Sequence, residues 1–287
     1  MNSVDDLLEV LTLKNEKDYY LGVSETVGSK NVFGGQVLAQ SLNAAYQSIN
    51  DRKLHSLHSY FLERGDLNLP IRYYVDQIRD GGSFSTRRVT AKQNDSTIFI
   101  LAASFHKDEK GYEHYIKYEK EVKPPEDLLS WSQLYEKYSI LMPKKLKNFL
   151  KIERPIEFKP VETPKLISNK ELPPKYDIWF KLKGEIPDLS IMIKQQILTY
   201  ISDYNLLRAA LNPHSHKTKF ANTMTASLDH AMWFYRDFSL DDWLLYSVES
   251  PSASNARGMT RGHIYTRKGV LIASVAQEGL IRPIDKK

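Results

Sequence analysis

The order of the predicted elements constrains the fold of this chain more than any other feature of its sequence. One helix followed by a run of long strands is predicted twice. The first copy predicts a helix at 33–45 and strands at 54–62, 71–79, 84–93 and 97–106. The second copy predicts strands at 156–161 and 178–183, a helix at 188–211, and strands at 223–235, 243–250, 259–266 and 270–281. A shift of 172 residues places His58 on His230 and Tyr74 on Tyr246, which indicates an internal repeat.

A helix followed by several strands indicates the α+β class rather than a parallel sheet built from strand–helix–strand units. We therefore expect two tandem domains, each a curved antiparallel sheet wrapped around one central helix, which is the hotdog arrangement. The predicted boundaries are 1–110 for the N-terminal hotdog domain, 111–150 for a charged connector, and 151–287 for the C-terminal hotdog domain. The connector contains prolines and is predicted to hold one helix near 128–150.

Composition excludes several classes of protein. The absence of cysteine among 287 residues excludes disulfides, thiolate metal sites and a cysteine nucleophile. Basic and acidic residues are interleaved despite a formal net charge of +5, so we expect no nucleic-acid partner. The apolar runs at 98–103 and 270–276 are far shorter than the roughly 20 residues of a membrane-spanning helix, so no span is expected.

The two ends of the sequence favour a cytoplasmic location. The N-terminus is acidic and lacks the basic start and apolar stretch of a signal peptide. Residues 284–287 carry neither a peroxisomal tripeptide nor a prenylation box. Because sheet edges commonly pair with another copy, we also expect a homodimer or homotetramer.

Familiar catalytic and cofactor motifs are missing. The sequence has no Gly-x-Ser-x-Gly elbow, no phosphate-binding Gly-x-x-x-x-Gly-Lys-Ser/Thr loop and no Gly-x-Gly-x-x-Gly fingerprint. The pattern His-Glu-x-x-His is also missing, and the polar loop containing His214 and His216 is better interpreted as surface than as a metal site. We expect neither a metal nor a cofactor.

Three polar residues stand where apolar residues are expected. Asp203 flanks the apolar face of the second helix, Gln277 interrupts the apolar strand at 270–281, and Ser227 lies at the head of the strand at 227–234. A carboxylate beside a core face is costly unless it is hydrogen-bonded. Each residue also has a structural interpretation: Asp203 at a break in the helix or facing solvent, Gln277 at a strand end, Ser227 bonded to the local backbone. For Asp203, spacing alone slightly favours the structural interpretation.

Seven motifs, in order along the chain, are similar to those of one enzyme family. They are VFGGQV at 32–37, HSLHSYFL at 55–62, RDGGSF at 79–84, LDHAMWF at 228–234, LLY at 244–246, SPSASNARG at 250–258 and QEG at 277–279. With them the chain resembles the acyl-CoA thioesterase II (TesB-type) family from residue 32 to residue 282. The resemblance implies a double hotdog that hydrolyses medium- to long-chain fatty acyl-CoA to free fatty acid and CoA.

The resemblance also implies the catalytic residues. The family uses an Asp, a Thr or Ser and a Gln to hold the attacking water, and these correspond to Asp203, Ser227 and Gln277. Bacterial members commonly carry Thr where this chain has Ser227, so the hydroxyl is kept without the methyl group that stiffens χ1. Asp203 would accept a proton from the water while the other two orient it.

Five residues are candidates for binding the substrate. A backbone N–H near Gly34 or Gly35 could donate to the oxyanion. Arg257 and Arg261 are candidates for the CoA phosphates, although surface arginines more often serve other roles. His58, inside one of the shared motifs, completes the set.

Two other functions stay open from the sequence. One is a hotdog hydratase or dehydratase acting on an acyl thioester, with His230 and Asp229 as its acid–base pair. Neighbouring residues on a strand point to opposite faces, which weakens that pair. The other is a non-catalytic module that binds acyl-CoA. Three observations separate these functions. Release of free thiol indicates a thioesterase, loss of an enoyl-CoA chromophore indicates a hydratase, and binding without turnover indicates a binding module.

Overall fold

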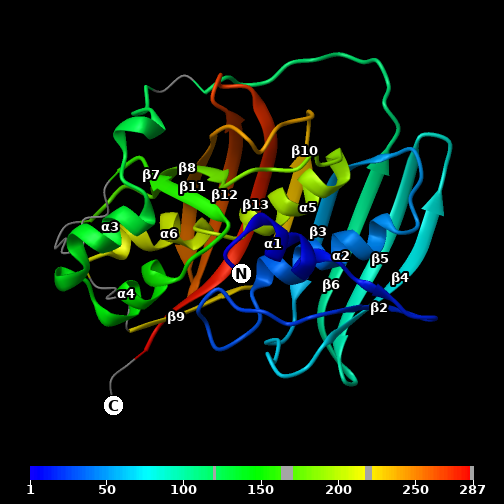
Figure 1. The fold of residues 1–287 in the computed structure, drawn as a ribbon, viewed down its shortest axis with the longest axis horizontal. Helices are drawn as coiled ribbons and strands as arrows, with labels where there is room; N and C mark the ends of the chain where they lie inside the picture. The colour runs from blue at the N-terminus through cyan, green and yellow to red at the C-terminus, as the bar shows by residue number, and fades with distance from the viewer. Residues whose placement is uncertain (119–120, 163–170, 217–221, 285–287) are drawn as a thin grey trace.

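The computed structural model describes residues 1–118, 121–162, 171–216 and 222–284 (Figure 1). The last three residues, on which the prediction about a peroxisomal signal rests, lie outside this set. The helices are α1 (Val4–Leu11), α2 (Gly34–Tyr46), η1 (Pro125–Asp127), α3 (Trp131–Tyr138), η2 (Ser139–Leu141), α4 (Lys144–Lys151), α5 (Ile191–Ser202), α6 (Leu206–Leu211) and η3 (Asn212–His214). The strands are β1 (Lys14–Asn15), β2 (Tyr20–Gly22), β3 (Lys53–Phe61), β4 (Ile71–Asp80), β5 (Phe84–Gln93), β6 (Ser96–His106), β7 (Ile156–Pro160), β8 (Lys175–Leu182), β9 (Thr223–Ser227), β10 (Asp229–Phe234), β11 (Leu244–Ser254), β12 (Arg257–Thr266) and β13 (Leu271–Pro283).

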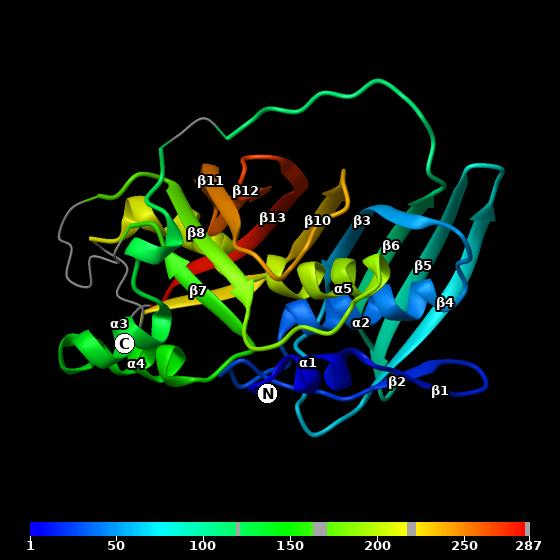
Figure 2. The same ribbon diagram turned by 45° about the horizontal axis from the view of Figure 1, so that its top comes forward.

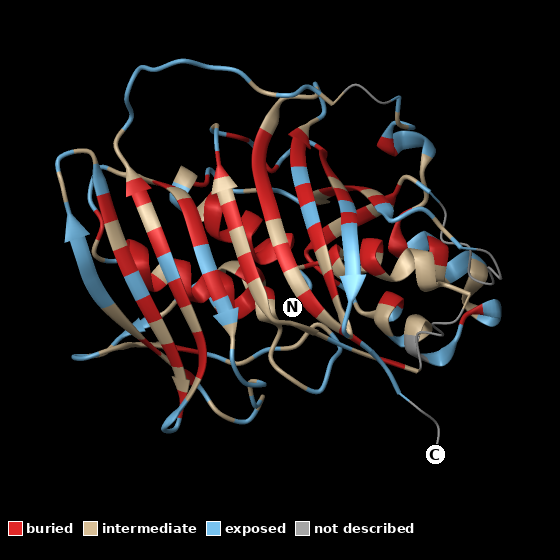
Figure 3. Ribbon diagram, turned by 180° about the vertical axis from the view of Figure 1, so that it is seen from behind, coloured by how far each residue is buried: buried red, intermediate tan, exposed pale blue. Residues whose placement is uncertain are grey.

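Both halves of the chain share one antiparallel sheet. Within the described residues its order is β1-β2-β4-β5-β6-β3-β10-β13-β12-β11-β8-β7, and β9 pairs with β13. The order β4-β5-β6-β3 is mirrored by β11-β12-β13-β10, so the two copies meet at the β3–β10 pair. Helices α2 and α5 lie side by side across one face (Figure 2), and the sheet is seen from its other face in Figure 3. The predicted α+β double hotdog is confirmed.

The two central helices run in opposite directions and touch closely. Helix α2 has 13 residues, of which 11 are buried, as expected for a helix packed on all sides. A Cβ atom on Gly35 would lie 2.4 Å from the carbonyl oxygen of Tyr200, so only glycine allows the start of α2 to meet the end of α5. At the opposite end of the pair, Asn43 Nδ2 donates to Gln196 Oε1 at 3.0 Å.

The connector differs from its prediction. The single helix expected near 128–150 is wrong, because α3 ends at Tyr138 and α4 begins after Pro143. Proline lacks the backbone N–H and its ring clashes with a preceding helical turn, so it stands before α4 rather than within a longer helix. Among the described helices, none is long and apolar enough to cross a membrane.

Two predicted elements of the C-terminal half are also divided. The helix expected at 188–211 is α5 followed by α6, because Asn205 adopts a left-handed backbone with φ of 69°. The strand expected at 223–235 becomes β9 and β10, which separate at Leu228. Both interruptions occur next to a candidate catalytic residue, Asp203 in the first case and Ser227 in the second.

The repeat alignment fails at the centre of the sheet, where it places side chains of opposite faces on each other. Along the β3–β10 pair His230 is opposite Ser59, and Ala231 is opposite His58. His230 and Ser59 are buried, whereas His58 is exposed. Because a shift of one residue moves a side chain to the other face, His58 and His230 do not occupy equivalent positions, and that prediction is wrong.

Candidate active site

Asp203 is positioned by the end of a buried helix. Helix α5 begins at the N-cap Ser190 and ends at Ser202, and Asp203 is its C-cap. The left-handed Asn205 then turns the chain into α6. Asp203 therefore ends a helix at a break, as its structural interpretation expected, and its carboxyl group also meets polar partners.

The three predicted catalytic side chains form one chain of hydrogen bonds. Ser227 Oγ donates to Asp203 Oδ1 at 3.0 Å, and Gln277 Nε2 donates to Ser227 Oγ at 3.1 Å. Ser227 is the last residue of β9 and is paired with Gly279 on β13, the strand that also carries Gln277. Residues from a helix end and two neighbouring strands thus share one site.

The N-terminal half closes this site through two glycines. A Cβ atom on Gly34 would lie 2.8 Å from Asp203 Oδ2 and 2.9 Å from Cε1 of Phe61. The backbone of Gly35 is hydrogen-bonded to the Asp203 carboxyl group. The partly positive start of α2 therefore faces the carboxylate, as expected for an anion at a helix N-terminus. The predicted Gly34 and Gly35 lie at the site, but the Gly35 backbone binds Asp203 itself.

Burial makes Asp203 a stronger base than an ordinary aspartate. Desolvation raises the pKa of its carboxyl group from 3.8 to about 6, although the hydrogen bonds from Ser227, Gln277 and the Gly35 backbone act in the opposite direction. The residue is intermediate in exposure rather than fully buried. A carboxylate with a pKa near neutrality is suited to general-base catalysis.

His230 joins the same hydrogen-bond chain, a contact that the sequence pattern did not indicate. The residue is fully buried, its Nδ1 lies 2.6 Å from Gln277 Oε1, and its Nε2 lies 2.9 Å from Ser202 Oγ. Burial lowers its pKa from 6.5 to about 4, so the ring is neutral at neutral pH. Alternation along β10 shows that His230 faces inward, but its partners became evident only with the strand register.

The pair proposed for hydratase chemistry is separated. Asp229 precedes His230 on β10 and therefore points to the other face of the sheet. There its Oδ1 accepts a hydrogen bond from the Glu278 backbone N–H at 2.6 Å. Both ring nitrogens of His230 have other partners, so the two side chains do not form a unit.

The other predicted substrate-binding side chains lie away from this cluster. Arg257 Nε is 3.0 Å from Glu278 Oε2 in an ion pair. Arg261 is exposed on β12. His58 is on the outer face, edge-on to the ring of Trp233 at 5.3 Å between centroids. The structure does not bring these three to Asp203.

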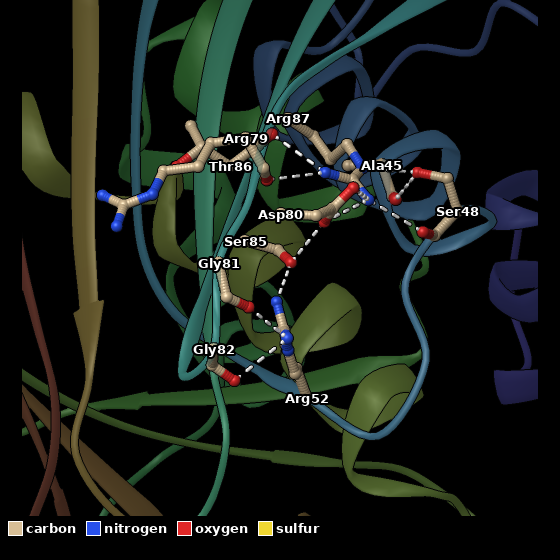
Figure 4. Close-up of polar contacts among 10 residues, drawn as sticks. All are labelled: Ala45, Ser48, Arg52, Arg79, Asp80, Gly81, Gly82, Ser85, Thr86 and Arg87. Atoms are coloured by element: carbon tan, nitrogen blue, oxygen red, sulfur yellow. Dashed lines mark hydrogen bonds and ion pairs between the residues drawn. The ribbon is translucent and has the colours of Figure 1, made fainter.

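A second polar cluster lies near the opposite end of α2, and Figure 4 shows its contacts. We call it the Arg87 cluster, and it consists of Ser48, Arg52, Asp80, Ser85 and Arg87. The buried Arg87 guanidinium donates to Asp80 Oδ1 at 2.9 Å and to Ser48 Oγ at 2.7 Å. Hydrogen bonds from Ser85 and Arg87 lower the pKa of the Asp80 carboxyl group.

Known proteins are similar to this chain in both fold and sequence. A family model described as acyl-CoA thioesterase matches residues 146–280, and one described as acyl-CoA thioesterase N-terminal domain matches residues 24–106. Acyl-CoA thioesterase 2 of Haemophilus influenzae is 39% identical over 97% of this chain and 98% of its own length. Acyl-coenzyme A thioesterase 8 of Mus musculus is 41% identical over 93% of this chain and 85% of its own.

A solved structure agrees with these relatives. The crystal structure of an acyl-CoA thioesterase II from Mycobacterium marinum superimposes with a TM-score of 0.78 at 34% identity, covering 96% of this chain and 97% of that one. The fold and these matches define the chain as an enzyme of the double-hotdog thioesterase class. More narrowly, the chain belongs to the acyl-CoA thioesterase II (TesB-type) family.

Proposed function

We propose that this protein hydrolyses medium- to long-chain fatty acyl-CoA to free fatty acid and CoA, with Asp203 as the general base. The observation that carries the proposal is the hydrogen-bonded cluster of the Asp203 carboxyl group, Ser227 and Gln277, in which burial raises the pKa of the carboxyl group to about 6. The names of the relatives support the substrate class. The chain-length range is supported by the sequence resemblance.

The attacking water is assigned to the space beside Asp203 Oδ2. A side chain at residue 34 would enter this space, since a Cβ atom there would lie 2.8 Å from that oxygen. Ser227 donates to the other oxygen, Oδ1, and we propose that Oδ2, which borders this space, accepts the proton. Besides the hydrogen donated to Ser227, Gln277 directs a second amide hydrogen at the Asp203 carboxyl group, beside the place assigned to the water, and we propose that the water oxygen accepts it when water is bound.

The reaction then proceeds without a covalent enzyme intermediate. The water oxygen attacks the thioester carbonyl carbon while Asp203 takes a proton from the water. The resulting tetrahedral oxyanion collapses, the carbon–sulfur bond breaks, and the CoA thiolate leaves and takes up a proton. A thiolate is a good leaving group, so general-base help of about 10²–10⁴-fold is a sufficient contribution from Asp203.

The experiment that tests the proposal compares two aspartates that stand on neighbouring elements. Release of free CoA from palmitoyl-CoA by Asp203→Asn should have a kcat about 10²–10⁴-fold below that of the parent, with KM little changed. Asp229→Asn is the matched control, because Asp229 is on the opposite face of β10 and should keep kcat within about twofold. Activity of Asp203→Asn within a few-fold of the parent would contradict the proposal.

Three finer properties belong to the same proposal. CoA release measured over a panel of acyl lengths should be fastest for medium to long chains. We also propose a cytoplasmic location and a homodimer or homotetramer, both of which rest on the sequence. Cell fractionation tests the location, and light scattering coupled to gel filtration tests the oligomeric state.

A further inference from the structure

His230 is a buried titratable group that the proposed reaction does not use. Its side chain is fully buried, and both ring nitrogens lie within hydrogen-bond distance of a polar side chain. One of those partners is Gln277, which the mechanism does use. The direction of each hydrogen bond decides what His230 contributes.

The directions follow from the charge of Asp203. An ionised carboxylate only accepts hydrogen bonds, so the hydroxyl of Ser227 must donate to Asp203 Oδ1. Ser227 Oγ then accepts from the amide nitrogen of Gln277, which turns the amide oxygen toward His230. Because an amide oxygen cannot donate, the hydrogen of that bond belongs to His230 Nδ1.

We propose that His230 is a positioning residue that acts as the Nδ1–H tautomer and fixes the orientation of the Gln277 amide, and through it the hydroxyl of Ser227 toward Asp203. In the reversed amide orientation, Oε1 would face Ser227 and attract its hydroxyl hydrogen. Asp203 would then lose a donor, and the proposed water would lose the second N–H of Gln277. The catalytic part of this inference rests on the proposed function, whereas the tautomer does not.

The neutral tautomer is completed by Ser202. A neutral imidazole has one N–H, so in this tautomer Nε2 accepts from the hydroxyl of Ser202 at 2.9 Å. That hydroxyl also donates to the carbonyl oxygen of Thr199 at 2.8 Å, so the two acceptors share its single hydrogen. Ser202 is itself held in place, because Tyr246 donates to its carbonyl oxygen at 3.0 Å. The hydrogen bonds thus form a circuit that starts at Ser202 and ends at its neighbour in sequence, Asp203. Between them the circuit includes His230, Gln277 and Ser227. A closed circuit of this kind leaves little freedom for any one member to rotate.

Nitrogen-15 NMR of the histidine side chains tests the tautomer directly. In the parent protein labelled at histidine, the His230 ring should be neutral between pH 6 and 8, with its hydrogen on Nδ1. The signal is assigned by its loss in a His230 variant. A hydrogen on Nε2 would overturn the proposal. This result does not depend on catalysis, so an absence of thiol release would refute the proposed function and leave the tautomer to stand or fall on the NMR result.

A matched pair of variants tests the effect on the reaction. Asn and Leu have nearly the same shape, and both remove the ring, but only the Asn amide can donate from about the position of Nδ1. His230→Leu should lose about 10–100-fold in kcat with KM changed less than about threefold, the usual range for a partner that orients a ligand. His230→Asn should keep kcat within about fivefold of the parent.

A purely structural role for His230 would lower the melting temperature of both variants without separating their kcat values, and equal kcat values would overturn the inference. His263→Leu is the control, since this histidine on β12 contacts Ser274 rather than the circuit and should keep its kcat. If neither His230 variant folds, the tautomer measured in the parent decides the question.

Discussion

The two ends of the central helix pair hold carboxylates in opposite ways. Where α2 begins, the Asp203 carboxyl group is hydrogen-bonded to a hydroxyl, a side-chain amide and a backbone amide, and no ion pair in the described part of the chain involves it. Near the end of α2, Asp80 is paired with the guanidinium of Arg87. The pKa of Asp203 is raised to about 6, whereas that of Asp80 is lowered. The first arrangement gives Asp203 the proton affinity that the proposed general base needs, and the second uses the Asp80 charge to stabilise the buried Arg87.

This difference has a physical origin in the partners. Neutral donors offset only part of the cost of burying Asp203, so its carboxylate keeps an affinity for protons. The Arg87 cluster satisfies its cation with the Asp80 carboxylate, Ser48 and backbone carbonyl groups. These hydrogen bonds stabilise the ionised forms of Arg87 and Asp80, so the Asp80 carboxylate has a low affinity for protons. In a repeated fold, the two ends can therefore serve separate purposes.

Adding one methyl group at each end gives the largest expected contrast. Gly34→Ala places a carbon about 2.8 Å from Asp203 Oδ2, where the water is proposed, and should lower kcat/KM about 100-fold. Gly82→Ala, in the turn beside Arg52, meets no atom within 4 Å and should leave both activity and stability unchanged. The measurement is CoA release, and equal activities for the two variants would refute the placement of the water.

Removing the cation of the Arg87 cluster should affect stability and not catalysis. Arg87→Met should lower the free energy of unfolding by about 2–3 kcal/mol, because buried carbonyl and hydroxyl acceptors lose charged donors. The kcat of the folded fraction should stay unchanged. Arg88→Met, one residue along the same strand, removes only an exposed pair with Asp76 and should cost about 0–1 kcal/mol. Equal losses in urea unfolding would contradict this account of the cluster.

Asp203→Asn should stabilise the protein while it removes activity. The folded-state pKa of about 6 lies above the ordinary aspartate value of 3.8, so the folded state binds more protons between these pH values, and stability falls as pH rises through that window. Above about pH 6, the parent has lost the stability that a protonated Asp203 contributes. The uncharged Asn should raise the free energy of unfolding by about 1–2 kcal/mol, after allowance for the partial exposure of residue 203. Urea unfolding at pH 7.5 and pH 4 checks this: the gain should be present at pH 7.5 and nearly absent at pH 4.

Ser227→Thr should produce the smallest change. The threonine keeps the hydroxyl that donates to Asp203 and adds a methyl group that restricts χ1. We expect kcat within about threefold of the parent. Ser227→Ala serves as its counterpart and should lose roughly 10–100-fold, since a hydrogen bond to a charged group is removed. Equal activity of the Thr and Ala variants would show that the hydroxyl is not needed.

Most of the fold could be predicted because hydrophobic periodicity reports helices and strands directly. The repeated order of one helix and several strands gave the double hotdog, and the strand at 84–93 agrees with β5 at both ends. The interruptions were missed because periodicity continues across them. Pro143 was visible in the sequence, but the left-handed Asn205 carries no pattern of its own.

The site was predicted in part. Asp203, Ser227 and Gln277 were named from the sequence, and the structure brings them together, although spacing alone did not separate them from structural polar residues. His230 could not be paired with Gln277 without the register of β10 against β13. The misplacement of His58 has the same cause, because an error of one residue reverses every side chain of a strand.

The pH dependence of kcat/KM for palmitoyl-CoA hydrolysis tests the central claim most directly. A general base must be deprotonated to act, so activity should rise with pH along a limb with an apparent pKa of about 6 and reach a plateau above about pH 7. The residual activity of Asp203→Asn should lack that limb. If the parent shows a flat profile from pH 5 to 8, or if the variant keeps the same limb, then Asp203 is not the base.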